Sequence, residues 1–86
     1  MIEHSSLLGY PNPSDGIITI RLNSSITSKY QIKAIDITGR TFVLGDVNAM
    51  KGSNFYKLDI RNMAKGVIYI IFQTKDAQLK TKIMVK

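Results

Sequence analysis

Val67-Ile-Tyr-Ile-Ile-Phe-Gln73 contains the longest apolar run of this 86-residue chain, which extends from Val67 to Phe72. A helix that spans a bilayer needs about 20 apolar residues, so this run is far too short to cross a membrane. A short apolar run that follows a glycine and is rich in β-branched and aromatic residues is typical of a strand with both faces covered. We therefore expect a central β-strand over residues 67–73 that forms the main part of the core.

The segments on either side of this strand alternate apolar and polar residues, with the two-residue period of half-buried strands. Ile18, Ile20 and Leu22, for example, share one face, while Thr19 and Arg21 share the other. No segment shows the long three- and four-residue apolar repeat of a helix. Strands are expected over residues 17–22, 30–37, 41–44, 55–60, 67–73 and 78–86, with a seventh if residues 7–10 pair.

Turns rich in Gly, Asn and Asp separate these strands at intervals of roughly 8 to 12 residues, which is the pattern of a small sandwich. A single sheet would leave one apolar face in water, and a second sheet covers that face. We therefore expect an all-β fold, a small antiparallel β-sandwich of six to seven strands. Residues 45–54 are expected to form a connection. Ile35 and Ile37, which are apolar on the polar side of their strand, indicate a bulge or a strand with both faces partly covered.

The length and composition restrict the function classes. The chain is long enough for one small domain, and the absence of cysteine excludes a disulfide framework and a thiolate metal site. A formal net charge of +6 raises nucleic acid, anionic lipid and acidic polysaccharide as partners.

Part of the positive charge is concentrated in the final strand, where Lys80, Lys82 and Lys86 are expected to line one face. This strand has no aromatic residue between its lysines for base stacking, so nucleic acid is not expected as a partner. Lysines on an exposed edge strand also block edge-to-edge aggregation. A structural role and a role in ligand binding therefore both stay open.

Side chains for catalysis are poorly supplied. His4 is the only histidine, so a Ser-His-Asp arrangement would depend on the N-terminal segment. The carboxylates are spread through separate turns, and the chain has neither a His or Cys cluster nor a calcium-type Asp-x-Asp-x-Asp loop. The sequence thus predicts no enzyme, no catalytic residue, no metal site and no cofactor.

Two turns are distinguished by their residue types. Pro11 and Pro13 have no N–H group, so the segment that ends at Gly16 cannot continue a sheet ladder and is expected to form a turn. Residues 36–40 are expected to form a tight hairpin turn. In that turn Gly39 supplies a positive φ, and the Asp36 carboxylate binds neighbouring amides.

Four motifs, taken in order, resemble those of a known family. They are Tyr10-Pro-Asn-Pro-x-x-Gly16, then Asp36-x-x-Gly-Arg40, then Leu58-Asp-Ile60 with Met63-Ala-Lys-Gly66, and finally Lys82-Ile-Met-Val-Lys86. The set resembles the type A C-terminal sorting domain of the type IX (Por) secretion system of Bacteroidetes, over residues 8–86. Each motif alone is ordinary turn chemistry, and it is their order and spacing in a short all-β chain that make the resemblance specific.

The resemblance implies a compact Ig-like β-sandwich at the C-terminus of a larger exported protein. Residues 7–86 would be the sorting domain, and residues 1–6 a disordered or added segment. Such a domain directs a cargo joined in cis through the outer-membrane translocon and is not itself an enzyme. In related cargo a sortase then removes the domain, and the cargo is attached to the cell surface or released. The implied route passes through the periplasm and ends at the cell surface or outside the cell.

The resemblance also assigns roles to individual residues, which belong to the entry turn, the hairpin turn, the start of the central strand and the final strand. No membrane span is expected, and the oligomeric state is left open. Family members commonly place an aromatic residue two positions after the glycine of the central strand, whereas Ile68 stands there and Tyr69 follows. The turn residues are Pro11, Asn12, Pro13, Gly16, Asp36, Gly39, Arg40 and Gly66, and the recognition residues are Lys80, Lys82, Val85 and Lys86.

A second interpretation comes from a different class, an extracellular binding module for carbohydrate or another surface polymer. The sandwich fold and the positive charge motivate it. Binding of polysaccharide at physiological salt would favour this module, whereas a large exported protein encoded directly upstream would favour the sorting signal.

Overall fold

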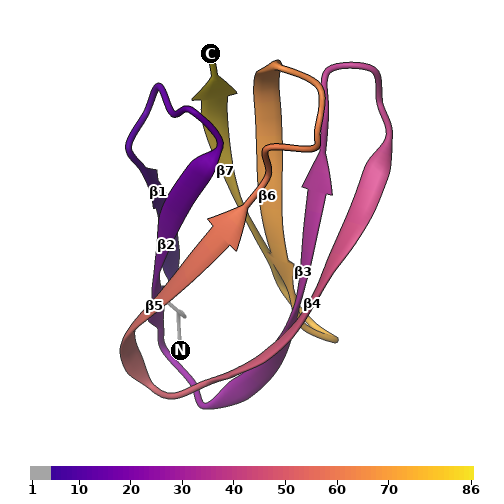
Figure 1. The fold of residues 1–86 in the computed structure, drawn as a ribbon. Helices are drawn as coiled ribbons and strands as arrows, with labels where there is room; N and C mark the ends of the chain where they lie inside the picture. The colour runs from indigo at the N-terminus through magenta and orange to yellow at the C-terminus, as the bar shows by residue number, and fades with distance from the viewer. Residues whose placement is uncertain (1–4) are drawn as a thin grey trace.

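Residues 5–86 fold into a sandwich of seven antiparallel strands in two sheets, which confirms the expected all-β class (Figure 1). A computed structural model of the chain describes residues 5–86. Most of these residues lie in the strands or in the short turns between them. The strands are β1 (Ser6–Tyr10), β2 (Ile17–Ser24), β3 (Ser28–Ile35), β4 (Thr41–Ala49), β5 (Gly52–Asp59), β6 (Gly66–Gln73) and β7 (Gln78–Val85).

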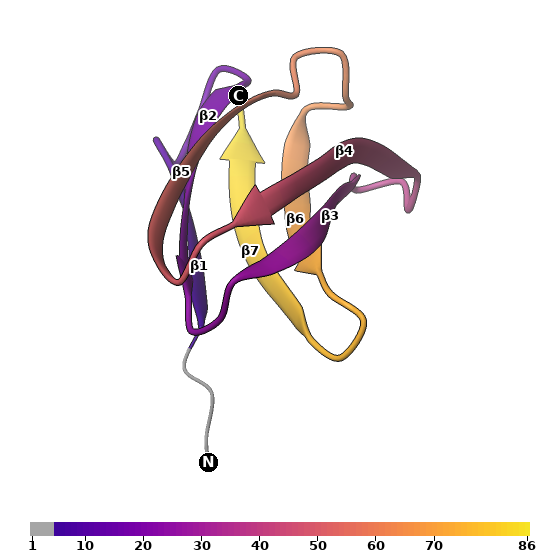
Figure 2. The ribbon, with the colours of Figure 1, turned by 90° about the horizontal axis from the view of Figure 1, so that it is seen from below.

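The two sheets have the strand orders β1-β2-β5 and β4-β3-β6-β7. Every pairing between named strands is antiparallel. Figure 2 shows the chain passing from one sheet to the other between β4 and β5. The sheets face each other because each has one apolar face, which only the other sheet can cover.

The core lies between the sheets and is built by the alternation of each strand. Ile18, Ile20 and Leu22 of β2 are almost fully buried, as the sequence predicts. From the other sheet, Ile68, Ile70 and Phe72 of β6 pack against them. Other buried members of this cluster are Tyr30, Ile32, Ala34, Ala49, Ile60, Met63, Ile83 and Val85.

The central strand β6 lies between β3 and β7, and its two faces differ. Ile68 and Phe72 face the core. Tyr69 and Ile71 face the opposite side, where Ile71 is only 4% exposed and Tyr69 is 37% exposed. The prediction of a strand covered on both faces is therefore correct for Ile71 and only partly correct for Tyr69.

The expectation of a connection over residues 45–54 is wrong. β4 continues through Ala49, and β5 already begins at Gly52. The register of β4 against β3 shifts at this point, because Gly45 is opposite Ile32 whereas Val43 is opposite Lys33. Leu44 is therefore an extra residue in β4, and the glycine and aspartate that suggested a loop belong to a bulged strand.

The expectation of a bulge or a two-sided strand at residues 35–37 is correct only for Ile35, which is half-buried on the outer face beside buried Ala34. β3 ends at Ile35, and Ile37 is 67% exposed in the following turn. The change of direction at Asp36, rather than a bulge in β3, places this isoleucine on the outside.

The N-terminal expectation falls mostly outside the described residues. Residues 1–4 of the expected disordered or added segment are among those that the structure does not describe, and this includes His4. Ser6 opens β1, which pairs with β2, so the optional seventh strand is present.

Candidate recognition surface

The motif segments that the sequence singled out meet at one end of the sandwich, although they are up to about 70 residues apart in the chain. Residues 11–16 connect β1 to β2, residues 36–40 connect β3 to β4, and residues 60–66 lead from β5 into β6. Figure 1 shows these connections at the same end as the C-terminus. We call residues 11–16, 36–40, 60–66 and 82–86 the motif end.

The entry turn holds the edge of β7 through four hydrogen bonds. The Asn12 side chain accepts a hydrogen bond from the Met84 N–H at 3.0 Å, and its amide donates to the Lys82 carbonyl at 3.3 Å. The Ser14 N–H donates to the Met84 carbonyl at 2.7 Å, and the Lys86 N–H donates to the Ser14 carbonyl at 2.9 Å. The edge of β7 near the C-terminus, which would otherwise be unpaired, is thus closed by a turn.

The same turn is tied to the loop after β5. The Ile60 N–H donates to the Gly16 carbonyl at 2.8 Å. The Ser14 side chain is buried, and its hydroxyl accepts a hydrogen bond from the Gly16 N–H at 2.9 Å. Gly16 has φ 116°, and a Cβ at this position would lie 2.5 Å from Cγ of Arg61, so the backbone conformation and the close contact both require glycine.

The hairpin turn forms around the buried carboxylate of Asp36. Its Oδ1 accepts hydrogen bonds from the N–H groups of Thr38 at 2.9 Å and Arg40 at 3.1 Å, and Gly39 has φ 89°. The hydrogen bond from the Thr38 hydroxyl lowers the pKa of Asp36, and the nearby charge of Arg40 acts in the same direction. The Arg40 guanidinium lies 3.2 Å from Asp36 Oδ2, so the turn is a closed polar unit.

The loop after β5 begins with a second close ion pair. Nη2 of Arg61 lies 2.7 Å from Oδ2 of Asp59, and both side chains are at least half exposed. Hydrogen bonds from the Arg61 side chain and backbone lower the pKa of Asp59 to about 2. Exposed ion pairs contribute little to stability, so we expect this pair to add little to the stability of the domain.

The final strand presents its lysines as the sequence predicts, with one exception among the recognition residues. Lys80, Lys82 and Lys86 are exposed on one face, and Met84 lies between them at 45% exposure. Val85 is only 4% exposed and belongs to the core cluster. Any role of Val85 in recognition would therefore act through the packing of β7 in the folded domain and not through direct contact.

Sequence reasoning missed two kinds of residue at these sites. Ser14 was not singled out, although its buried hydroxyl and backbone link Gly16 to the last strand. Tyr69 and Lys33 lie on the same outer face as the lysines of β7, which only the strand order reveals. Lys80 Nζ lies 5.3 Å from the centroid of the Tyr69 ring, so the basic face does contain an aromatic residue, contributed by β6.

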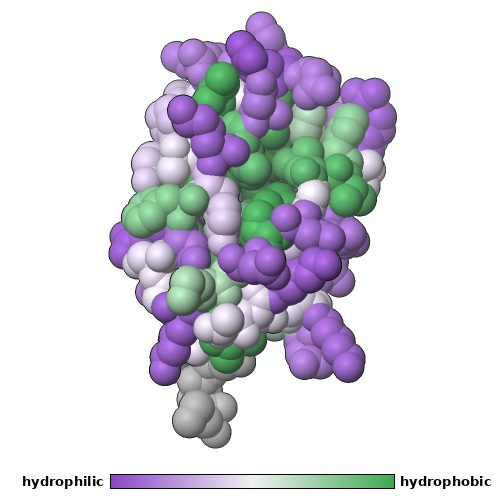
Figure 3. Space-filling view, turned by 60° about the horizontal axis from the view of Figure 1, so that its bottom comes forward, coloured by the Kyte–Doolittle hydropathy of each residue, from purple (hydrophilic) through white to green (hydrophobic). Residues whose placement is uncertain are grey.

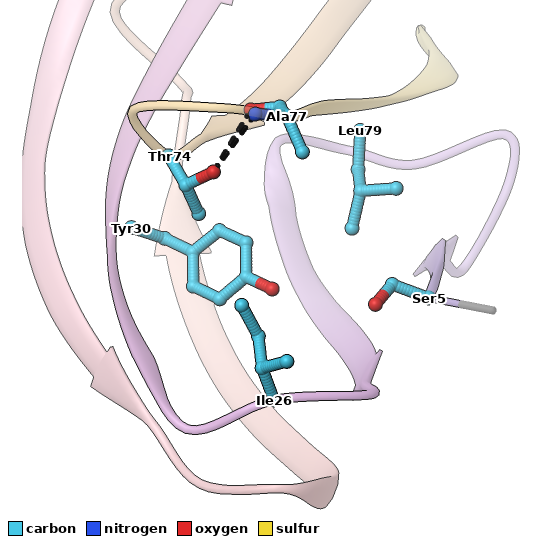
Figure 4. Close-up of a pocket in the computed structure, with 6 residues that line it drawn as sticks. All are labelled: Ser5, Ile26, Tyr30, Thr74, Ala77 and Leu79. Carbon is cyan, nitrogen blue, oxygen red and sulfur yellow. Dashed lines mark hydrogen bonds between the residues drawn. The ribbon is translucent and has the colours of Figure 1, made fainter. Parts of the chain in front are cut away.

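The opposite end of the sandwich contains a small cleft of about 240 Å³ between the sheets. Figure 4 shows Tyr30 and Leu79 among the side chains that line it, with Thr74 accepting a hydrogen bond from the Ala77 N–H at 2.9 Å. In Figure 3, where the bottom of Figure 1 comes forward, apolar side chains gather in a patch surrounded by hydrophilic ones. None of the motif residues lines this cleft.

Residues 5–86 contain neither a membrane-spanning helix nor a group of side chains suited to hold a metal ion. No helix in this range is long and apolar enough to cross a membrane. The same residues contain no group of three or more His, Asp or Glu side chains that could hold a metal ion.

The described residues thus form a small β-sandwich with ordered turns and a basic edge strand at one end. The family model described as secretion system C-terminal sorting domain matches residues 9–86, which is nearly the whole chain. The chain therefore belongs to the C-terminal sorting domains of type IX secretion, as its resemblance indicated. Comparisons with curated proteins and with solved structures gave no match.

Proposed function

We propose that this domain is a folded sorting signal, which the outer-membrane translocon recognises at the motif end and along the exposed side of β7. Membership in the sorting-domain family supports a cargo joined in cis and an exported destination at the cell surface or outside. The proposed route passes through the periplasm, and a sortase later removes the domain so that the cargo is attached or released. Recognition, rather than catalysis, is the proposed activity.

The observation that carries the proposal is the meeting of the four motifs around the end of β7. Asn12 and Ser14 hold Met84 in place, while the side chains of Lys82 and Lys86 stay exposed beside them. Binding of a receptor to this surface would therefore require that the entry turn and the last strand are both correctly folded.

The proposed roles of the motif residues divide into two groups. Pro11, Pro13 and Gly66 act through the shape of the motif end, as do Asn12, Gly16, Asp36 and Gly39. Lys80, Lys82 and Lys86 are exposed, and we assign them direct contact with the translocon. Arg40 is exposed as well, but its guanidinium is engaged with Asp36.

The test fuses residues 5–86 to a reporter that is exported to the periplasm of a Bacteroidetes host with a type IX system. The wild-type fusion should reach the cell surface or medium. Lys82→Glu/Lys86→Glu should leave the reporter in the periplasm, because the charge of the contact surface is reversed while the buried face of β7 is unchanged. A wild-type fusion that stays in the periplasm would refute the sorting function.

A matched control separates recognition from net charge. Lys51→Glu/Lys57→Glu changes the formal charge by the same amount, and both residues are exposed away from β7 and the motif end. This control should be exported like the wild type. If the control and the Lys82/Lys86 variant are retained equally, the proposed location of the contact surface is wrong.

A further inference from the structure

The outer face of the four-stranded sheet gathers cations on both sides of β6. The register places Lys33 of β3 opposite Ile71, and Ile71 opposite Lys80 of β7, so that these three side chains form one row. In the neighbouring row Tyr69 is opposite Lys82. We call Lys33, Tyr69, Ile71, Lys80 and Lys82 the lysine face.

No ion pair among residues 5–86 neutralises the positive charge of this face. The ion pairs among the described residues use Lys29, Arg40 and Arg61, and none of them uses a cation of the lysine face. Asp46 lies on the same side of the sheet, on β4, but its carboxylate is 3.6 Å from Lys29. The field in front of β6 and β7 is therefore positive, and it favours a partner of negative charge.

The lysine face also has an apolar floor. Ile71 is 4% exposed although it lies outside the core cluster, so side chains of this outer face must cover it. The long stems of Lys33 and Lys80, on the strands at either side, are suited to this. Tyr69 and Met84 add apolar surface at 37% and 45% exposure. A partner therefore meets cations and apolar groups together.

We infer that the lysine face binds an acidic surface of a protein of the export machinery, and that this surface also presents apolar side chains. The inference rests on the proposed sorting function. Lys80 and Lys82 are two residues apart on one strand, which separates them by about 6.8 Å. Carboxylates on alternate residues of an extended protein segment have the same spacing. Such a segment matches the lysine face in the sign of its charge and in the spacing of its charged side chains.

Other anionic partners fit the face less well. The apolar side chains of this face lie below the ammonium groups of the lysines. These apolar side chains therefore cannot reach the acyl chains of an anionic membrane. Lys80 Nζ lies over the Tyr69 ring at 5.3 Å, so the aromatic surface that a sugar ring would stack on is already occupied. These two partners become alternative outcomes of the test.

The experiment measures binding of the purified domain to the detergent-solubilised, purified translocon of the host, by biolayer interferometry at several salt concentrations. Lys33→Glu/Lys80→Glu/Lys82→Glu should weaken binding by at least tenfold. Arg21→Glu/Lys51→Glu/Lys57→Glu, a control with the same formal charge on exposed positions elsewhere, should stay within about twofold of the wild type. Tyr69→Ala should weaken binding severalfold at high salt as well as low salt. Six of the seven exchanged sites are exposed, and Lys33 is half-buried.

Circular dichroism checks that each variant is folded, and the Lys→Gln version of the triple variant replaces the Glu version if that one unfolds. Equal binding by the triple variant and its control refutes the inference. Stronger binding of the wild type to vesicles of phosphatidylglycerol, or to polygalacturonate, than to the translocon also refutes it. A wild-type domain that directs export and binds the translocon, with unchanged binding by both the triple variant and Tyr69→Ala, refutes the lysine face alone. A wild-type domain that does neither refutes the sorting function itself, and the inference with it.

Discussion

Replacing Asn12 with alanine should release the C-terminal edge of β7 at a small cost in global stability. The change removes the acceptor for the Met84 N–H, at 3.0 Å, and the donor to the Lys82 carbonyl, at 3.3 Å. Each intramolecular hydrogen bond contributes roughly 0.5–1.5 kcal/mol net. Both bonds are exposed and one is long, so water replaces part of the loss, and we expect about 1 kcal/mol in total. For a domain of this size that lowers Tm by about 4–8 °C.

Amide hydrogen exchange, followed by NMR, resolves where this loss falls. The Met84 amide should exchange about fivefold faster in Asn12→Ala, because 1 kcal/mol corresponds to that factor. Ile18→Val, which removes a buried methylene from β2, should accelerate amides that exchange through global unfolding, such as Phe72 in the central strand, but not the local opening that exposes Met84. Asn48→Ala is the control, because Asn48 is exposed on β4 and its side chain makes no hydrogen bond to residues 5–86.

Export of the reporter fusion tells whether this contact matters for recognition or only for folding. Ile18→Val removes one buried methylene from β2 and costs about 0.5–1.5 kcal/mol, which matches the expected loss in Asn12→Ala. We expect export to fall further in Asn12→Ala than in Ile18→Val. Unchanged Met84 exchange and an unchanged Tm would show that Asn12 does not hold the edge of β7. Equal export of Asn12→Ala and Ile18→Val would show that Asn12 affects export only through the stability of the domain.

Gly16→Ala should cost more stability than Gly39→Ala in denaturant unfolding, by more than about 1 kcal/mol, because both positions have positive φ but only at Gly16 does the added Cβ meet Arg61 at 2.5 Å. Acid should destabilise the domain between about pH 4 and pH 2. Asp59 has a folded pKa of about 2 against an ordinary 3.8, so its stabilising effect is complete above the ordinary value and lost as pH falls through the folded one. The buried carboxylate of Asp36 also has a lowered pKa, so Asp36→Asn should reduce this pH dependence more than Asp59→Asn, whose ion pair is exposed. Equal acid titrations of the wild type and both variants by circular dichroism would contradict the assignment. Tyr56→Phe should leave Tm unchanged or higher, since the Tyr56 hydroxyl is buried with no hydrogen-bond partner among residues 5–86, and a clear loss of Tm would show that the hydroxyl is satisfied.

Alternation along the chain predicts which residues enter the core, because a strand in a two-layer sandwich must bury one side. Ile18, Ile20 and Leu22 are buried as expected, and so is Ile83. The pattern fails at residues 45–54, where a glycine and an aspartate indicate a loop. Pairing with β3 keeps this segment in the sheet, and a bulge at Leu44 accommodates the register.

The candidate site was predictable in its turns and not in its assembly. The residue types of Asp36 and Gly39 determine the hairpin turn locally, through hydrogen bonds within five residues. The contact of Asn12 with Met84 spans 72 positions and depends on the order of strands in the sheets. The same holds for Tyr69 beside Lys80, since a single strand gives no sign of the side chains on its neighbour.

These contacts depend on the whole fold, so the proposed sorting signal differs from a linear sequence signal in that it requires a folded domain. Lys82 and Lys86 belong to a strand whose inner side is held by Ile83 and Val85 in the core and whose edge is held by the entry turn. Partial unfolding would release the turn and the strand together, so the contact surface exists only on a folded domain. β1 begins at the end of the sandwich opposite the C-terminus (Figure 1), so under the proposed function a cargo that precedes β1 leaves the motif end accessible to its receptor.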